Sequence, residues 1–143
     1  MIFSDTSTLA KFYIVEPESA AVRRVFERAG QVMLSQLARA ELLGVFHRRL
    51  RERNWTRAEF QACVRQFQRD EADGLWVWAP VDSATLVAVC ETFLALPETL
   101  FLRTADSIHL MTAIKQGFDA IHTHDRHQSG AAEHLGIQAI ILS

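Results

Sequence analysis

Five short apolar runs, separated by segments of helical periodicity, constrain the fold more than any other feature of the sequence. The runs occupy residues 1–5, 31–35, 74–81, 119–125 and 137–142. Helices are predicted over residues 7–13, 17–30, 36–54, 57–72, 83–95, 104–117 and 126–136. Strands that alternate with helices favour a parallel sheet covered by helices on both faces. We therefore predict an α/β fold of three layers, with a central parallel sheet of about five strands.

Polar residues at the starts of the predicted helices supply capping signals. Thr6 or Ser7 can cap the first helix, and Ser35 can cap the helix that follows the second strand. In the stretch WTRAEF, Thr56 and Glu59 have the spacing of a capping box, in which each side chain satisfies a backbone N–H of the other residue. This pattern predicts a helix that begins at residue 57.

Length and composition narrow the class of protein. A chain of 143 residues matches the usual size of one domain, so we expect residues 1–143 to form a single domain. With 49% apolar and 22% charged residues, the composition is that of a soluble globular protein. Neither a membrane span nor a signal peptide is recognisable, and we expect a cytoplasmic protein. Cys63 and Cys90 match no zinc or redox spacing, and both are predicted to be buried thiols.

Acidic residues stand where such a fold places its functional sites. Asp5 and Asp125 end two predicted strands, and Asp106 lies in the first turn of a predicted helix. Sites in these folds form outside the carboxyl ends of the strands. Asp106 alone could be a simple helix N-terminal charge. Glu41 occupies the apolar stripe of its helix, which leaves either a site residue or a buried ion pair with an arginine.

Four carboxylates at one edge of a sheet would repel one another unless a cation neutralised them. A divalent metal ion with hard oxygen ligands, Mg²⁺ or Mn²⁺, meets that need. Such an ion polarises a phosphoryl oxygen and activates a water molecule. The residues alone therefore suggest a metal-dependent phosphodiester or phosphoryl hydrolase.

Four stretches, in this order, carry a family resemblance that covers nearly the whole chain: FSDTSTLAKFYIVEPES, RAEL, LRTADSIHLMTA and THDRHQSGAAEHLGI. They resemble the PIN-domain ribonucleases and, within them, the VapC-type toxins of bacterial toxin–antitoxin pairs. The resemblance implies a Rossmann-like PIN domain, Mg²⁺ or Mn²⁺ as cofactor, and endonucleolytic cleavage of RNA. It also implies a homodimer and a small antitoxin whose tail fills the acidic pocket.

The resemblance assigns roles to residues by position. Asp5, Asp106 and Asp125 would bind the metal ion, and Glu41 would act through water, as a ligand or as the base. Neighbours of these acids are expected to line the pocket, namely Thr6, Ser7, Arg103 and Thr123. Arg103 also matches the family's LRTAD and is expected to pair with a carboxylate. The histidine in THDRH departs from the small residue that is usual there, which leaves the role of His124 open.

Arginines dominate the basic residues, with 13 of the 15 basic positions, and cluster in HRRLRERNWTR. The cluster is either a solvated helix face or a surface that binds RNA phosphates or an acidic antitoxin tail. Arg48, Arg49, Arg51 and Arg53 are the candidate RNA contacts. Trp76 and Trp78 are expected to pack in the core or at a dimer interface rather than to stack on bases.

Other functions remain as alternatives. The leading one is a non-catalytic PIN-like module that binds RNA or a partner, for which one of the acids should be missing. A phosphatase loop of the haloacid dehalogenase kind would need a second Asp where Ser7 stands. A dinuclear zinc site of the metallo-β-lactamase type would need a histidine directly after Asp125, where Arg126 stands.

Overall fold

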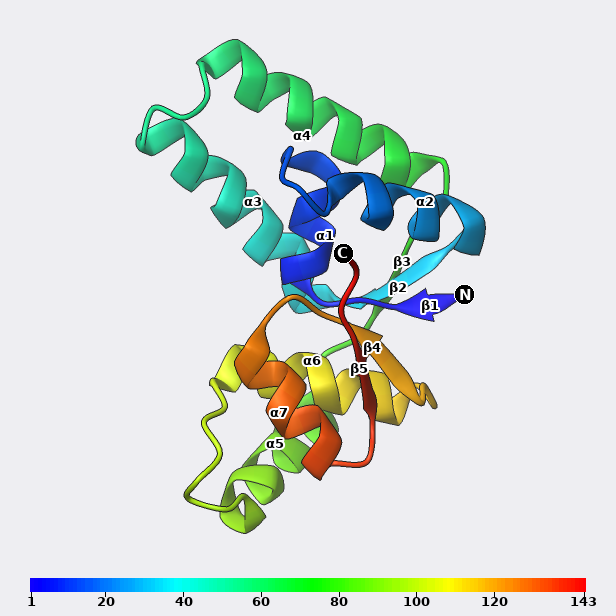
Figure 1. The fold of residues 1–143 in the computed structure, drawn as a ribbon, viewed down its shortest axis with the longest axis vertical. Helices are drawn as coiled ribbons and strands as arrows, with labels where there is room; N and C mark the ends of the chain where they lie inside the picture. Colours follow the sequence, from blue (N-terminus) through cyan, green and yellow to red (C-terminus); the bar gives the residue numbers. More distant parts are fainter.

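The computed structural model describes all 143 residues and contains five strands and seven helices (Figure 1). The strands are β1 (Ile2–Phe3), β2 (Val32–Ser35), β3 (Trp76–Ala79), β4 (Ala120–His122) and β5 (Gln138–Ile140). The helices are α1 (Thr6–Tyr13), α2 (Ser19–Ala29), α3 (Gln36–Arg51), α4 (Arg57–Ala72), α5 (Ser83–Ala95), α6 (Thr104–Lys115) and α7 (Arg126–His134). All of the predicted elements are present, and the differences lie in their ends.

The strands are all parallel and form a three-stranded sheet in the order β1-β2-β3 and a two-stranded sheet of β4 and β5. A bridge between Ser4 and His122 joins β1 to β4, and the amide of Asp5 donates to the carbonyl of His122. The five strands therefore lie side by side, although the predicted sheet is continuous only through this bridge. Asp5 follows β1 and Thr123 follows β4, so both residues lie at the carboxyl edge of the strands.

Helices cover both faces of the strands, with α1–α4 on one side and α5–α7 on the other (Figure 1). Successive side chains of each strand point to opposite faces of the sheet. In β2, Val32 and Leu34 belong to the core beneath α1–α4, whereas Met33 packs against the core beneath α5–α7. Two apolar cores thus hold the strand ends in place, which confirms the predicted α/β class. None of the helices is long and apolar enough to span a membrane.

The structure corrects three predictions about caps and cysteines. Asp5, not Thr6 or Ser7, caps α1, because its carboxylate accepts the amide of Thr8. Ser35 stands at the N-cap of α3 but makes no capping hydrogen bond. Cys63 is half-buried, because it lies at the border of the core, and Cys90 is exposed.

Two other local predictions are confirmed. The capping box of Thr56 and Glu59 is formed, and α4 begins at residue 57. Trp76 is a core residue with 4% of its surface exposed. Trp78 packs beside the same core, and its indole N–H donates to Glu71. The tryptophans therefore serve packing in this chain.

Candidate active site

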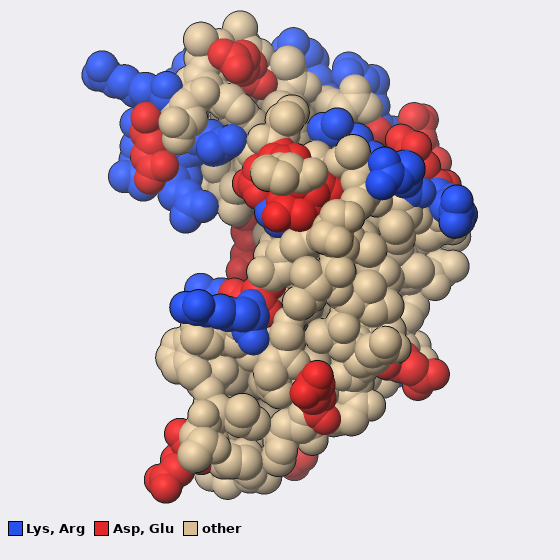
Figure 2. All heavy atoms as spheres, viewed as in Figure 1, with Lys and Arg blue, Asp and Glu red and all other residues tan.

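A cavity of about 510 Å³ opens at the carboxyl edge of the strands. Figure 2 shows it as a hollow in one side of the molecule, with acidic atoms inside and basic side chains gathered on its rim. Four different elements each bring one of the predicted acids to this cavity. The acids are Asp5 before α1, Glu41 on α3, Asp106 on α6 and Asp125 before α7.

Asp5 is held by hydroxyl groups and a backbone amide rather than by a cation. Ser7 donates to both carboxylate oxygens, at 2.7 and 2.9 Å, and Thr123 donates to Oδ2 at 2.6 Å. The Asp5 side chain is buried, with only 2% of the residue exposed. Burial raises the pKa of Asp5, and the charge of His109 and the hydrogen bonds from Thr123, Ser7 and Thr8 offset this only in part.

Asp106 and Asp125 share one cation, Arg103. The Arg103 Nε donates to Asp106 Oδ2 at 2.9 Å, and its terminal nitrogen Nη2 donates to Asp125 Oδ2. Asp125 also caps α7, because its Oδ1 accepts the amides of His127 and Gln128. The hydrogen bond and charge of Asp106 raise the pKa of Arg103, so the guanidinium stays charged. The predicted pairing of Arg103 with a carboxylate is therefore confirmed.

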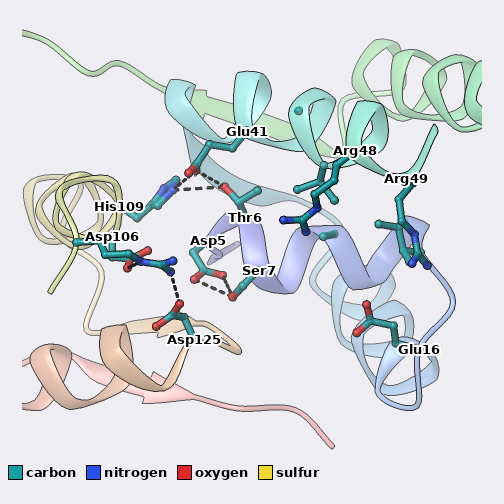
Figure 3. A pocket seen from close by; sticks show the side chains of 15 residues that line it. Asp5, Thr6, Ser7, Glu16, Glu41, Arg48, Arg49, Asp106, His109 and Asp125 are labelled. Carbon is teal, nitrogen blue, oxygen red and sulfur yellow. Dashed lines mark hydrogen bonds and ion pairs between the residues drawn. The ribbon is translucent and has the colours of Figure 1, made fainter. Parts of the chain in front are cut away.

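Glu41 is bonded to a buried histidine and not to an arginine. The His109 Nε2 lies 2.5 Å from Glu41 Oε1, and the Thr6 hydroxyl donates to the same oxygen at 2.6 Å (Figure 3). Burial on its own would raise the pKa of Glu41, but the hydrogen bond and charge of His109 and the hydrogen bond from Thr6 lower it overall. Glu41 is thus ionised at neutral pH.

Behind His109 stands Ser35, whose hydroxyl lies 2.9 Å from the ring nitrogen Nδ1. Both ring nitrogens are therefore engaged, and the ring is 2% exposed. Because Nε2 lies against a carboxylate, it donates to Glu41, and Nδ1 shares the second hydrogen bond with the Ser35 hydroxyl. Sequence reasoning missed this role of Ser35, since a serine directly before α3 is typical of a helix cap.

His124, whose role the sequence left open, connects α1 with the C-terminal end of the chain. Its Nδ1 lies 2.8 Å from the Thr8 hydroxyl on α1, and its Nε2 lies 2.7 Å from the carbonyl of Leu142. The His124 amide also donates to Ser7. The ring thus fixes the chain end against α1 and does not line the cavity.

The arginine cluster divides in two in the structure. Arg48 and Arg49 line the cavity at the end away from Asp106 and His109 (Figure 3). Arg51 lies within 3.7 Å of Glu52, and neither Arg51 nor Arg53 lines the cavity. The cavity therefore has an acidic end, formed by Asp5, Glu41, Asp106 and Asp125, and a basic end, formed by Arg48 and Arg49.

The chemistry of the acidic end fits a hard divalent cation. All four acids are oxygen donors, and Asp5 is a buried carboxylate without a basic partner. As the side chains stand, no three acidic, histidine or cysteine groups converge on one point. Arg103 lies against both Asp106 and Asp125, so an ion bound by these two acids would replace the guanidinium as their counter-charge.

Comparisons with known proteins identify relatives over the whole chain. The PIN domain family matches residues 2–133. Ribonuclease VapC46 of Mycobacterium tuberculosis is 31% identical over 147 residues, which cover 99% of this chain and 98% of that protein.

Solved structures share the fold at low sequence identity. The crystal structure of VapC20 of M. tuberculosis, described as a sarcin–ricin loop cleaving toxin, has a TM-score of 0.71 at 17% identity and covers 92% of this chain and 95% of its own. VapBC2 of Rickettsia felis, solved with a DNA fragment from its promoter, has a TM-score of 0.71 at 12% identity and covers 100% of both chains.

Proposed function

The chain belongs to the PIN domain family, and on that premise we propose that it is a metal-dependent endoribonuclease, the toxin of a toxin–antitoxin pair. One observation carries the proposal: four elements distant in sequence bring Asp5, Glu41, Asp106 and Asp125 to one open cavity. The relative at 31% identity is a ribonuclease. The proposed substrate is RNA, and residues 1–143 are proposed to form one PIN domain.

Each acid has a proposed task at this site. Asp5, Asp106 and Asp125 would hold a divalent ion, Mg²⁺ or Mn²⁺. When bound, that ion would neutralise charge on the phosphodiester and make a water molecule more acidic. Glu41 would orient this water, because its Oε1 is fixed by His109 and Thr6 while Oε2 has no partner within the protein. Ser7 and Thr123 would hold the Asp5 carboxylate in place.

A non-catalytic binding module is the weaker proposal. Such a module has no use for a buried carboxylate whose pKa is raised by burial, since an ionised group without a cation is destabilising there. Here none of the four acids is missing, and each is oriented by a hydrogen bond or ion pair within the protein. This arrangement favours catalysis.

The proposed protein partners are an antitoxin and a second copy of the chain. Structures that share the fold include the toxin–antitoxin complex VapBC2. For the second copy, α5 presents an apolar face, with Val87 56% and Leu94 88% exposed. We expect Leu94→Glu to convert a dimer to a monomer in light scattering, whereas Ile141→Glu, on another exposed apolar residue, leaves the dimer intact. Equal mass for both variants and wild type would refute this dimer.

A cytoplasmic location follows from the proposed RNA substrate, and the two free cysteines agree with a reducing compartment. The function itself is tested by cleavage of cellular RNA with Mg²⁺, with Mn²⁺ and with chelator. Wild type should cut at discrete sites, and chelator or Asp106→Asn should abolish this. Asp119→Asn is the matched control, because Asp119 is exposed and outside the cavity. Cleavage that survives Asp106→Asn or the chelator would overturn the proposal.

A further inference from the structure

One face of α3 runs the length of the cavity and joins its two ends. Glu41, Gly44, Val45 and Arg48 all line the cavity, at spacings of three, four and seven residues along the helix. Residues at these spacings lie on one helical face. Glu41 and Arg48 are thus about 10 Å apart along the helix axis, since each residue rises about 1.5 Å. The acidic and basic ends of the cavity therefore lie on one continuous surface of α3.

Gly44 lies between Glu41 and Arg48 on this face, and the packing around it does not require a glycine. Glycine is unfavourable in the interior of a helix, yet Gly44 lies in the middle of α3 with ordinary helical backbone. A Cβ atom built at Gly44 would meet nothing within 4 Å. Neither backbone conformation nor close packing requires a glycine there. What its missing side chain does is keep the surface between Glu41 and Arg48 open.

The two arginines at the basic end have no acidic partner. Neither Arg48 nor Arg49 belongs to any ion pair, in contrast to Arg39, Arg51 and Arg103. The Arg49 guanidinium lies over the ring of Trp55 at 5.8 Å, and its buried Nε has no hydrogen-bond partner. Glu16 also lines this end, but its carboxylate is paired with Lys11. Apart from the buried Nε of Arg49, the guanidinium nitrogens of both arginines are therefore available to an anion in the cavity.

We propose that Arg48 and Arg49 bind a backbone phosphate of the RNA strand next to the phosphate that is cleaved, and that Gly44 leaves room for the strand between them. This inference rests on the proposed ribonuclease function and adds the path of the RNA strand, which runs along α3 between Glu41 and Arg48. Guanidinium groups bind phosphate with paired hydrogen bonds. A polymer of regularly spaced phosphates can occupy the acidic end and the basic end at once, which favours RNA over an acidic protein segment.

Binding of a cleavage-resistant RNA oligonucleotide, with 2′-O-methyl groups throughout, tests the proposal in Mg²⁺ by fluorescence anisotropy. We expect Arg48→Gln with Arg49→Gln to raise Kd about tenfold. The slope of log K against log salt should fall by about 0.7 for each phosphate that the variant no longer neutralises. Arg65→Gln with Arg69→Gln, which removes the same charge outside the cavity, should leave Kd within twofold. Arg49→Lys keeps the charge and guards against a folding defect at Trp55.

The glycine gives an independent arm of the same experiment. Gly44→Leu should raise Kd for the RNA without lowering Tm, because leucine is a better helix former than glycine. Gly130→Leu is the matched control, since Gly130 is also a helical glycine with open space around it. Unchanged Kd for Gly44→Leu would exclude the path along α3.

Two results separate this inference from the function on which it rests. If the double arginine variant binds RNA as wild type does but loses affinity for a polyglutamate peptide, the basic end serves a protein and the inference is overturned. If RNA binding depends on Arg48 and Arg49 while wild type never cleaves RNA with any metal, the strand path stands and the ribonuclease proposal fails.

Discussion

The two ends of the cavity are built in opposite ways. At the acidic end, three of the four carboxylates are fixed by groups from other elements: Thr123 reaches Asp5, His109 reaches Glu41, and Arg103 reaches Asp125. Asp106 is held by Arg103 at the start of its own helix. At the basic end, Arg48 and Arg49 extend from a single helix and make no ion pair. Fixed groups suit bond breaking, which depends on position, whereas free arginines suit a flexible chain of phosphates.

Asp5 at the acidic end and Arg48 at the basic end differ in burial, and therefore in what they cost the stability of the fold. Asp5 is buried and has only hydroxyl and amide partners, so its charged form is disfavoured. Arg48 is exposed to water, so the absence of an ion pair costs it little. Substitutions at the acidic end should therefore lower kcat and can stabilise the fold, while substitutions at the basic end should act on RNA affinity.

Glu41→Gln is expected to have the largest effect. The amide keeps the shape of the side chain but cannot accept a proton from water, and we expect kcat to fall about 100-fold. Because Glu41 lies apart from Arg48 and Arg49, KM should stay within about twofold of wild type. Steady-state cleavage of a defined RNA measures both values. An increase in KM with unchanged kcat would mean that Glu41 contributes to RNA binding and not to bond breaking, which would contradict the division between the two ends.

A smaller loss is expected for His109→Gln, since His109 acts through Glu41 and not on the RNA itself. Removing the partner that orients a catalytic group commonly lowers activity about 10- to 100-fold. Glutamine can still donate to Glu41 Oε1, so we expect a fall in kcat near the lower limit, about tenfold. His109→Ala, which cannot donate, should be worse than His109→Gln at equal folded fraction by circular dichroism. Equal kcat for both variants would show that the hydrogen bond to Glu41 is unimportant.

Asp5→Asn should raise stability in the absence of metal. The folded-state pKa of Asp5 is raised above its ordinary value of 3.8, so between these two values the folded state binds more protons than the unfolded state. The stability of wild type accordingly decreases as pH rises through this window, and asparagine does not titrate. Asparagine is also a good helix cap at the start of α1.

Thermal melts from pH 4 to pH 8 in chelator check this expectation. The variant should have the higher Tm near neutral pH, and its advantage should shrink toward acid pH. Saturating Mg²⁺ should raise the Tm of wild type only. If wild type is the more stable protein at neutral pH without metal, burial does not strain Asp5 as inferred.

The smallest effect is expected for Gly44→Ala. Alanine in the interior of α3 should stabilise the fold by about 1 kcal/mol, because a Cβ there meets nothing within 4 Å. Urea unfolding would show this as a higher midpoint with the same slope. A lower midpoint would mean that the fold requires a glycine at position 44, contrary to the open space around it.

Much of the fold could be predicted from the sequence because local signals and global pattern agree. Thr56 and Glu59 mark the start of α4, and the apolar runs locate all five strands. Convergence of the four acids was predictable because parallel strands place their carboxyl ends at one edge. Caps were less certain: Asp5 serves both the helix and the cavity, and a sequence shows only that several polar residues are available.

Partners across the chain could not be predicted from the sequence. Glu41 and His109 are 68 positions apart, and Ser35 and His109 are 74 apart, so no spacing links them. An ion pair with an arginine was one of the two alternatives for Glu41, yet the buried ring of His109 is its partner because α6 packs against β2 and α3. The division of the arginine cluster likewise depends on which side of α3 faces the cavity.

Calorimetric titration of Mn²⁺ into metal-free protein tests the central claim most directly, that the acidic end is a metal site organised around Asp5. Wild type should bind Mn²⁺, Asp5→Asn should not bind it while remaining folded, and the double variant Arg48→Gln with Arg49→Gln should bind as wild type does. Equal Mn²⁺ binding by wild type and Asp5→Asn would contradict this claim.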